Sequence, residues 1–112
     1  MGFDAGLAER IREILGERSG ITERRMFGGL AFMLHGNMFV GILGTSLMAR
    51  VGPDRQREAL SLPHVREMDF TGRPMKGYVF VDAEGLGEDE ELESWVSRCI
   101  AFVRTLPAKA RK

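Results

Sequence analysis

Three short apolar runs follow one another between Leu30 and Val51, and only two or three residues separate each run from the next. His35-Gly36-Asn37 separates the first two runs, and Gly44-Thr45 separates the last two. Glycine and asparagine tolerate the positive φ of tight turns. Strands joined by such short turns must be antiparallel, because a parallel pair needs a long crossover. The sequence therefore predicts a three-strand antiparallel meander at residues 30–34, 38–43 and 46–51.

Segments with a helical period flank this meander. Apolar residues recur at i, i+4, i+8, i+11 and i+12 from Phe3, and at i, i+3, i+4, i+7, i+8 and i+11 from Leu92. Asp4 is a suitable N-cap for the first helix, and the acidic residues 88–91 favour the first turn of the last helix. The other predicted elements are a short helix at 54–60 and strands at 65–70 and 77–82.

The predicted order is helix, three strands, helix, two strands and helix (α-β-β-β-α-β-β-α). Helices that cover one side of an antiparallel sheet make an α+β domain. The chain has 112 residues, which is the usual size of one domain. We therefore expect a single α+β domain over residues 1–112, with an antiparallel sheet of about five strands: the meander plus two. Its core is expected at about residues 4–106, followed by a short basic tail at 107–112.

The glycine pair, the two histidines and the single cysteine are the residue types that most often form a catalytic or ligand-binding site. Their positions in this sequence do not favour such a site. Gly28-Gly29 precedes an apolar run instead of a helix, so it is interpreted as a bend at the start of a strand and not as a phosphate loop. His35 and His64 have no metal-binding spacing and no acidic or cysteine neighbour to activate them. Cys99 is the only cysteine and lies on an apolar helix stripe, which predicts a buried, inert thiol. We expect no enzyme activity, no metal and no cofactor.

The net charge and the lack of an evident targeting signal limit the classes of partner that we expect. Sixteen basic and sixteen acidic residues cancel, which disfavours direct binding to nucleic acid. No signal peptide is evident and no apolar stretch approaches the ~20 residues of a membrane span, so we expect a cytoplasmic protein with no membrane contact. Basic residues bracket the predicted strands and form the candidate interaction surface if they converge on one face. The alternative is that they are scattered, solvated charges that keep strand edges from aggregating. This surface comprises Arg24, Arg25, Arg50, Arg73, Lys76 and the nearby Tyr78.

Four stretches resemble the TfoX/Sxy N-terminal domain family: RRMFGGLAFMLHGNMFVGI, LMARVGPD, GRPMKGYVFVD and WVSRCIAFVRTLP. The resemblance runs from about Leu7 to Leu106. It implies an α+β fold with a curved antiparallel sheet and no catalytic activity. Full-length members are bacterial regulators of natural competence that act with the cAMP receptor protein. They carry a second, C-terminal domain, which we expect this chain to lack.

The resulting hypothesis is a non-enzymatic regulatory domain that binds another protein. The resemblance implies transcription machinery or a regulator such as the cAMP receptor protein as that partner, and a homodimer is a further expectation. One alternative is a nucleic-acid-binding module that uses the arginine-rich face, with Tyr78 or Phe70 stacking on bases. The other is a small-molecule pocket lined by Arg50, His64 and Tyr78.

Overall fold

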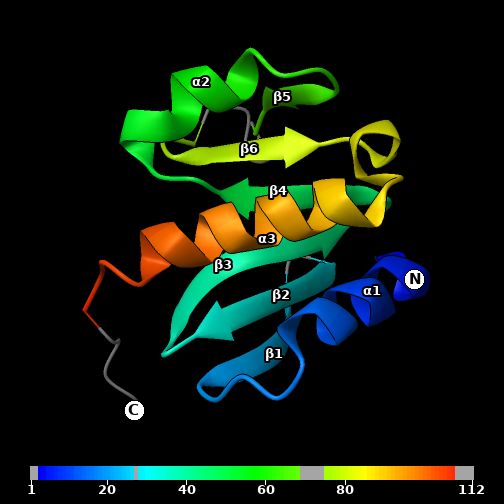
Figure 1. Cartoon of the computed structure of the whole chain (residues 1–112), viewed down its shortest axis with the longest axis vertical. Helices are drawn as coiled ribbons and strands as arrows, with labels where there is room; N and C mark the ends of the chain where they lie inside the picture. Colours follow the sequence, from blue (N-terminus) through cyan, green and yellow to red (C-terminus); the bar gives the residue numbers. More distant parts are fainter. Residues whose placement is uncertain (1–2, 27, 69–74, 108–112) are drawn as a thin grey trace.

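The computed structural model describes residues 3–26, 28–68 and 75–107. Six strands and three α-helices account for most of these residues (Figure 1). The elements are α1 (Ala5–Leu15), β1 (Ile21–Met26), β2 (Gly29–Leu34), β3 (Asn37–Leu43), β4 (Ser46–Arg50), η1 (Pro53–Arg55), α2 (Gln56–Leu60), β5 (Val65–Glu67), β6 (Tyr78–Val81), η2 (Ala83–Leu86) and α3 (Asp89–Val103).

The strands form one open antiparallel sheet in the order β1-β2-β3-β4-β6-β5. Helices α1 and α3 lie on one face, with α3 running across β3 and β4, while α2 lies beside β5 and β6 (Figure 1). This arrangement confirms the predicted α+β class, the antiparallel meander and the order of the helices. It also places the first and last strands of the sheet order, β1 and β5, at opposite edges.

The sheet has one strand more than the sequence predicted, because β1 was missed. Its residues, ITERRM, are mostly polar, and all but Ile21 are exposed. An edge strand with both faces in solvent has no alternation of apolar and polar residues to reveal it. The predicted bend at Gly28-Gly29 is confirmed as the turn that joins β1 to β2, where Gly28 has a φ of +78°.

Smaller differences concern the ends of elements. The predicted turn at residues 35–37 is formed by His35 and Gly36 alone, both with positive φ, and Asn37 begins β3. The predicted helix at 54–60 starts as the 3-10 turn η1 and becomes α-helical at Gln56. The strand predicted at 65–70 ends at Glu67 as β5, and its last two residues lie outside the described part of the chain.

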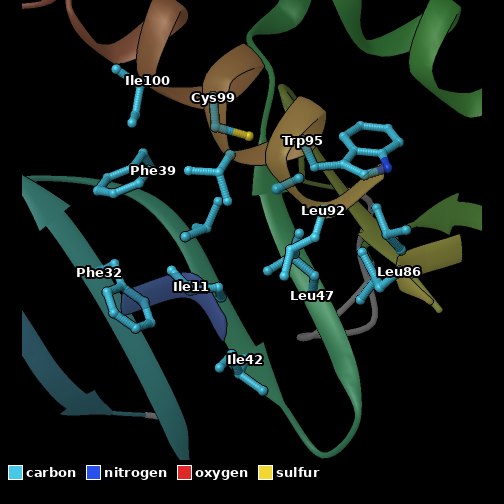
Figure 2. Close-up of a cluster of buried hydrophobic side chains, with 14 of the residues drawn as sticks. Ile11, Phe32, Phe39, Ile42, Leu47, Leu86, Leu92, Trp95, Cys99 and Ile100 are labelled. Carbon is cyan, nitrogen blue, oxygen red and sulfur yellow. The ribbon is translucent and has the colours of Figure 1, made fainter. Parts of the chain in front are cut away.

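The main core lies between the sheet and the helices α1 and α3. A bulge in β3 pairs Phe32 with Val40 and Met33 with Met38, so Phe39 is the extra residue. Phe39 and Val40 are both fully buried in this core. Figure 2 shows Phe39 facing Ile100 and Cys99 of α3, with other core side chains below them. The stripe predicted on the last helix is therefore the stripe that packs on the sheet.

A smaller apolar cluster lies on the sheet face that α1 and α3 leave free. Met48, Met68 and Phe80 are buried there, and half-buried Leu43, Met75 and Tyr78 pack against them. The amide of Met75 donates a hydrogen bond to the carbonyl of Met68, at 2.8 Å. These methionines fill space beside the strands.

Both long helices begin as the sequence indicates. The Asp4 carboxylate accepts hydrogen bonds from the amides of Gly6 and Leu7, at 2.9 and 3.2 Å. Glu88 and Glu91 form a reciprocal capping box at the start of α3. In the described part of the chain, no helix combines the length and the apolar character that a membrane span requires.

Candidate interaction site

The structure divides the predicted surface between two places. Arg24 and Arg25 lie on the edge strand β1, whereas Arg50 and Tyr78 lie side by side on β4 and β6. Strands β2 and β3 separate the two groups. Lys76 is exposed in the turn that leads into β6, and Arg73 lies outside the described residues. The described residues of the predicted surface therefore form two separate groups and not one basic face.

The second group belongs to a tightly connected structure, which we call the β4–β6 corner (residues 50–52 and 77–78). The amides of Val51 and Gly52 both donate to the carbonyl of Gly77, at 2.9 and 3.0 Å. Gly52 and Gly77 have φ values of +91° and +89°, a region that side chains rarely adopt. The two stretches that carry much of the family resemblance therefore meet at one point, although about 25 residues of chain separate them.

Gln56, the first residue of α2, ties this helix to the corner. Its Oε1 accepts a hydrogen bond from the Gly77 amide at 2.9 Å. Its Nε2 donates to the carbonyls of Met75 and Tyr78, both at 3.3 Å. One side chain thus satisfies three backbone groups in the turn that precedes β6.

Phe102, near the end of α3, covers the corner from the helix side. A Cβ atom added to Gly52 would lie 2.6 Å from the Phe102 ring, so only glycine fits beneath it. The Arg50 guanidinium lies 5.5 Å from the ring centre of Tyr78 and 5.7 Å from that of Phe102. Arg50 also donates a hydrogen bond to the carbonyl of Met38 at 3.3 Å. The positive charge of Arg50 is therefore held by contacts with β3, β6 and α3.

A hollow of about 500 Å³ lies against this corner, between the segment η1–α2 and helix α3. We call it the α2–α3 cleft. Its lining combines apolar groups near the sheet with charged groups of both signs, and the Arg55–Glu58 ion pair at 3.2 Å belongs to it. Arg98 lies over the Trp95 ring, 4.8 Å from its centre. The lining residues are Val51, Gly52, Asp54, Arg55, Glu58, Arg98, Ala101, Phe102 and Thr105.

The residues examined as possible catalysts do not gather. His35 and His64 are exposed in turns, with φ values of +51° and +66°. Within the described ranges, no three His, Cys, Asp or Glu side chains are placed to hold a metal ion. The α2–α3 cleft and a second hollow of about 250 Å³ near Asp4 both lack Arg50, His64 and Tyr78 in their linings.

Cys99 is fully buried in the main core (Figure 2). Burial raises the pKa of its thiol to about 12, because the thiolate would lose its hydration; a hydrogen bond with the Arg50 backbone opposes this more weakly. A thiol with this pKa supplies almost no thiolate at neutral pH. The predicted burial of this cysteine is confirmed, and its inertness remains a prediction.

The β1 edge (residues 21–26) carries the other two predicted arginines. The Glu23 carboxylate accepts two hydrogen bonds from Arg12 of α1, both at 2.7 Å, and the Arg12–Glu23 pair lowers the pKa of that carboxyl against the opposing effect of burial. The Arg25 guanidinium lies 5.6 Å from the centre of the Phe3 ring. These contacts attach one face of β1 to α1 and to Phe3, which precedes α1, and they leave Arg24 on the other face.

Together these features define a class: a small α+β domain with an open antiparallel sheet, two helices on one face and a cleft beside the last helix. The family model of the TfoX N-terminal domain matches residues 13–103, and the chain belongs to this family. The matched range runs from α1 to the end of α3 and so includes the β1 edge and the corner. Among curated proteins and among solved structures, no match to the chain was found.

Proposed function

We propose that this TfoX N-terminal domain is a non-catalytic regulatory module that binds another protein through the α2–α3 cleft. One observation carries the proposal: the family-like stretch that contains Arg50 continues into Val51 and Gly52, which line the cleft beside Phe102. The stretch that contains Tyr78 holds these two residues in place, because the Gly77 carbonyl accepts hydrogen bonds from both of their amides. The first stretch thus shapes a surface as well as a fold.

The chemistry of the cleft supports a protein ligand. Val51 and Phe102 provide an apolar floor, while Asp54 and Arg98 contribute opposite charges. An apolar centre with a polar rim is the usual anatomy of a protein interface. A hollow of about 500 Å³ has room for the anchoring side chains that dominate binding energy in such interfaces.

The polar groups of the corner support binding over catalysis. Gln56 already makes three hydrogen bonds, and Arg50 already lies against two rings and one carbonyl. A catalytic group needs an unused donor, acceptor or nucleophile aimed at substrate. Base stacking on Tyr78 is also disfavoured, because a guanidinium already lies over its ring. By family resemblance, the partner would be transcription machinery or a regulator such as the cAMP receptor protein.

Site-specific photocrosslinking in bacterial cells tests this proposal. A photoreactive phenylalanine analogue replaces Ala101, which is exposed and lines the cleft, or Glu13, which is exposed on α1 as a control. We expect one reproducible protein adduct from position 101 and none of that mass from position 13. The adduct should disappear when Arg98→Glu is added. Equal adducts from both positions, or an adduct that survives Arg98→Glu, would contradict the cleft as the binding surface.

A further inference from the structure

The β1 edge is the longer and more exposed of the two edges of the sheet. β1 has six residues, of which Thr22 to Met26 are all exposed, whereas β5 has only three. In the described part of the chain, no strand pairs with the outer side of β1. An edge of this kind presents a row of unpaired N–H and C=O groups that another extended segment can complete.

The free charge along this edge is positive on both faces. Glu23 is the only acidic residue of β1, and Arg12 engages both of its carboxylate oxygens. Arg25 lies on the helix side, above Phe3. Arg24 precedes it and therefore points to the opposite face, in register with Ala31.

This pattern opposes pairing with a second copy of the chain. In a two-fold antiparallel pair of β1 strands, one residue must lie opposite its own copy. A pairing that uses most of the strand is centred on Glu23 or Arg24 and places that charged residue in this position. Like charges directly opposite each other destabilise a strand pair. A second copy is therefore a poor occupant of this edge.

We propose that the β1 edge binds an extended acidic segment of a partner protein by strand addition. Two consecutive acidic residues in such a segment point to opposite faces, so one reaches Arg24 and the other reaches Arg25. The main-chain hydrogen bonds supply affinity, and the two charge pairs select the partner. This inference goes beyond the proposed function, because β1 is an edge strand and has no residue in the lining of the α2–α3 cleft, and α2 lies beside β5 and β6 at the other edge of the sheet (Figure 1).

Fluorescence anisotropy with a designed peptide tests the inference on the full chain. The probe is a labelled peptide of about eight residues, the length of a typical strand, with alternating valine and threonine and a central Asp-Glu pair. Two control peptides replace this pair by Lys-Lys or place proline beside it. The protein variants are Arg24→Glu/Arg25→Glu and a matched variant, Arg57→Glu/Arg104→Glu, which makes the same charge change at exposed residues away from β1.

We expect saturable binding of the acidic peptide to the parent protein and to the matched variant. Binding should fall at least about tenfold in the β1 variant and in the Lys-Lys and proline peptides, because charge pairs and edge hydrogen bonds are both needed. Circular dichroism confirms that each variant is folded. No binding to the parent, equal binding by the β1 variant, equal binding of the proline peptide, or equal competition by a single-stranded oligonucleotide would overturn the inference. None of these results depends on the crosslink at Ala101.

Discussion

The β4–β6 corner and the β1 edge both use arginines, but the two regions use them differently. In the corner, Arg50 lies among the Tyr78 ring, the Phe102 ring and a carbonyl, and the backbone beneath is fixed by Gly52 and Gly77. At the edge, Glu23 and Arg12 form the main tie, and both side chains are about a third exposed. Charge inside a packed corner fixes geometry, whereas charge on an open edge stays exposed to solvent.

The largest predicted effect is the substitution Gly52→Ala in the corner. The new Cβ would meet the Phe102 ring at 2.6 Å and would also sit at a φ of +91°, so we expect a loss of about 3 kcal/mol in the free energy of unfolding. Gly28→Ala is the matched control, because Gly28 also has a positive φ but no atom within 4 Å of an added Cβ. It should cost about 1 kcal/mol, the strain alone.

Urea denaturation of both variants measures this difference. Adding Phe102→Leu to Gly52→Ala should recover part of the loss, since the smaller side chain relieves the overlap but not the strain. Equal losses for Gly52→Ala and Gly28→Ala would show that the corner is not closely packed and would remove the contrast between the two regions.

The next largest effect is expected for Gln56→Ala. This change removes three hydrogen bonds and leaves the buried Gly77 amide without its partner, which should cost about 2 kcal/mol of stability. Gln56→Glu should cost at least as much, because it keeps the acceptor for the Gly77 amide at 2.9 Å but replaces the Nε2 donor by an oxygen that faces the carbonyls of Met75 and Tyr78. Thermal melts at fixed pH rank the variants. If Gln56→Glu were as stable as the parent, the two hydrogen bonds donated by Nε2 would not hold the turn.

The pH dependence of stability tests whether the Cys99 thiol is buried in the main core. The pKa of this thiol is about 12 in the folded chain and 9.0 in an ordinary thiol. Below pH 9.0 the thiol is protonated in both the folded and the unfolded chain, so the free energy of unfolding does not depend on this group there. As the pH rises above 9.0, the unfolded chain loses this proton first, and stability falls by about 1.4 kcal/mol per pH unit until about pH 12. Denaturation at successive pH values should show this additional slope in the parent and not in Cys99→Ala. The same slope in both proteins would contradict the burial of the thiol.

The smallest predicted effect belongs to the edge. Arg12 lowers the pKa of Glu23 below 4.5, so the pair stabilises the fold at neutral pH and the stabilisation is lost as the pH falls through the lowered pKa. Because both side chains are partly exposed, we expect Glu23→Gln to cost only about 0.5 kcal/mol. Parent and variant should converge in stability under acidic conditions. A cost as large as that of Gly52→Ala would mean that the edge is as tightly built as the corner.

The sequence predicted what depends on local pattern. The helical periods from Phe3 and Leu92 and the turn at His35-Gly36 are visible in neighbouring residues, and all three are confirmed. β1 was missed because an exposed edge strand has no apolar period. Register between distant strands was also out of reach, so Arg24 was grouped with Arg50 although two strands separate them.

The contacts that build the β4–β6 corner could not be predicted from the sequence either. Gln56 lies in none of the four family-like stretches, and Phe102 lies in the last of them with no local sign of its contact. Their roles follow from the placement of β6 beside β4 and of α3 above Gly52. The Gly52-Pro53 pair was the only local signal, because proline suits the first turn of the short helix predicted at 54–60. It gave no information about which ring covers Gly52. Long-range contacts of this kind require the fold before they can be recognised.

Native-state amide hydrogen exchange tests the contrast between corner and edge most directly. The amides of Val51, Gly52 and Gly77 have hydrogen-bond partners in the corner, so they should exchange only through global unfolding. The outward-facing amides of β1 should exchange nearly as fast as those of an unstructured peptide and should become protected when the acidic peptide binds. Fast exchange at the corner, or full protection along β1 in the free protein, would contradict the account.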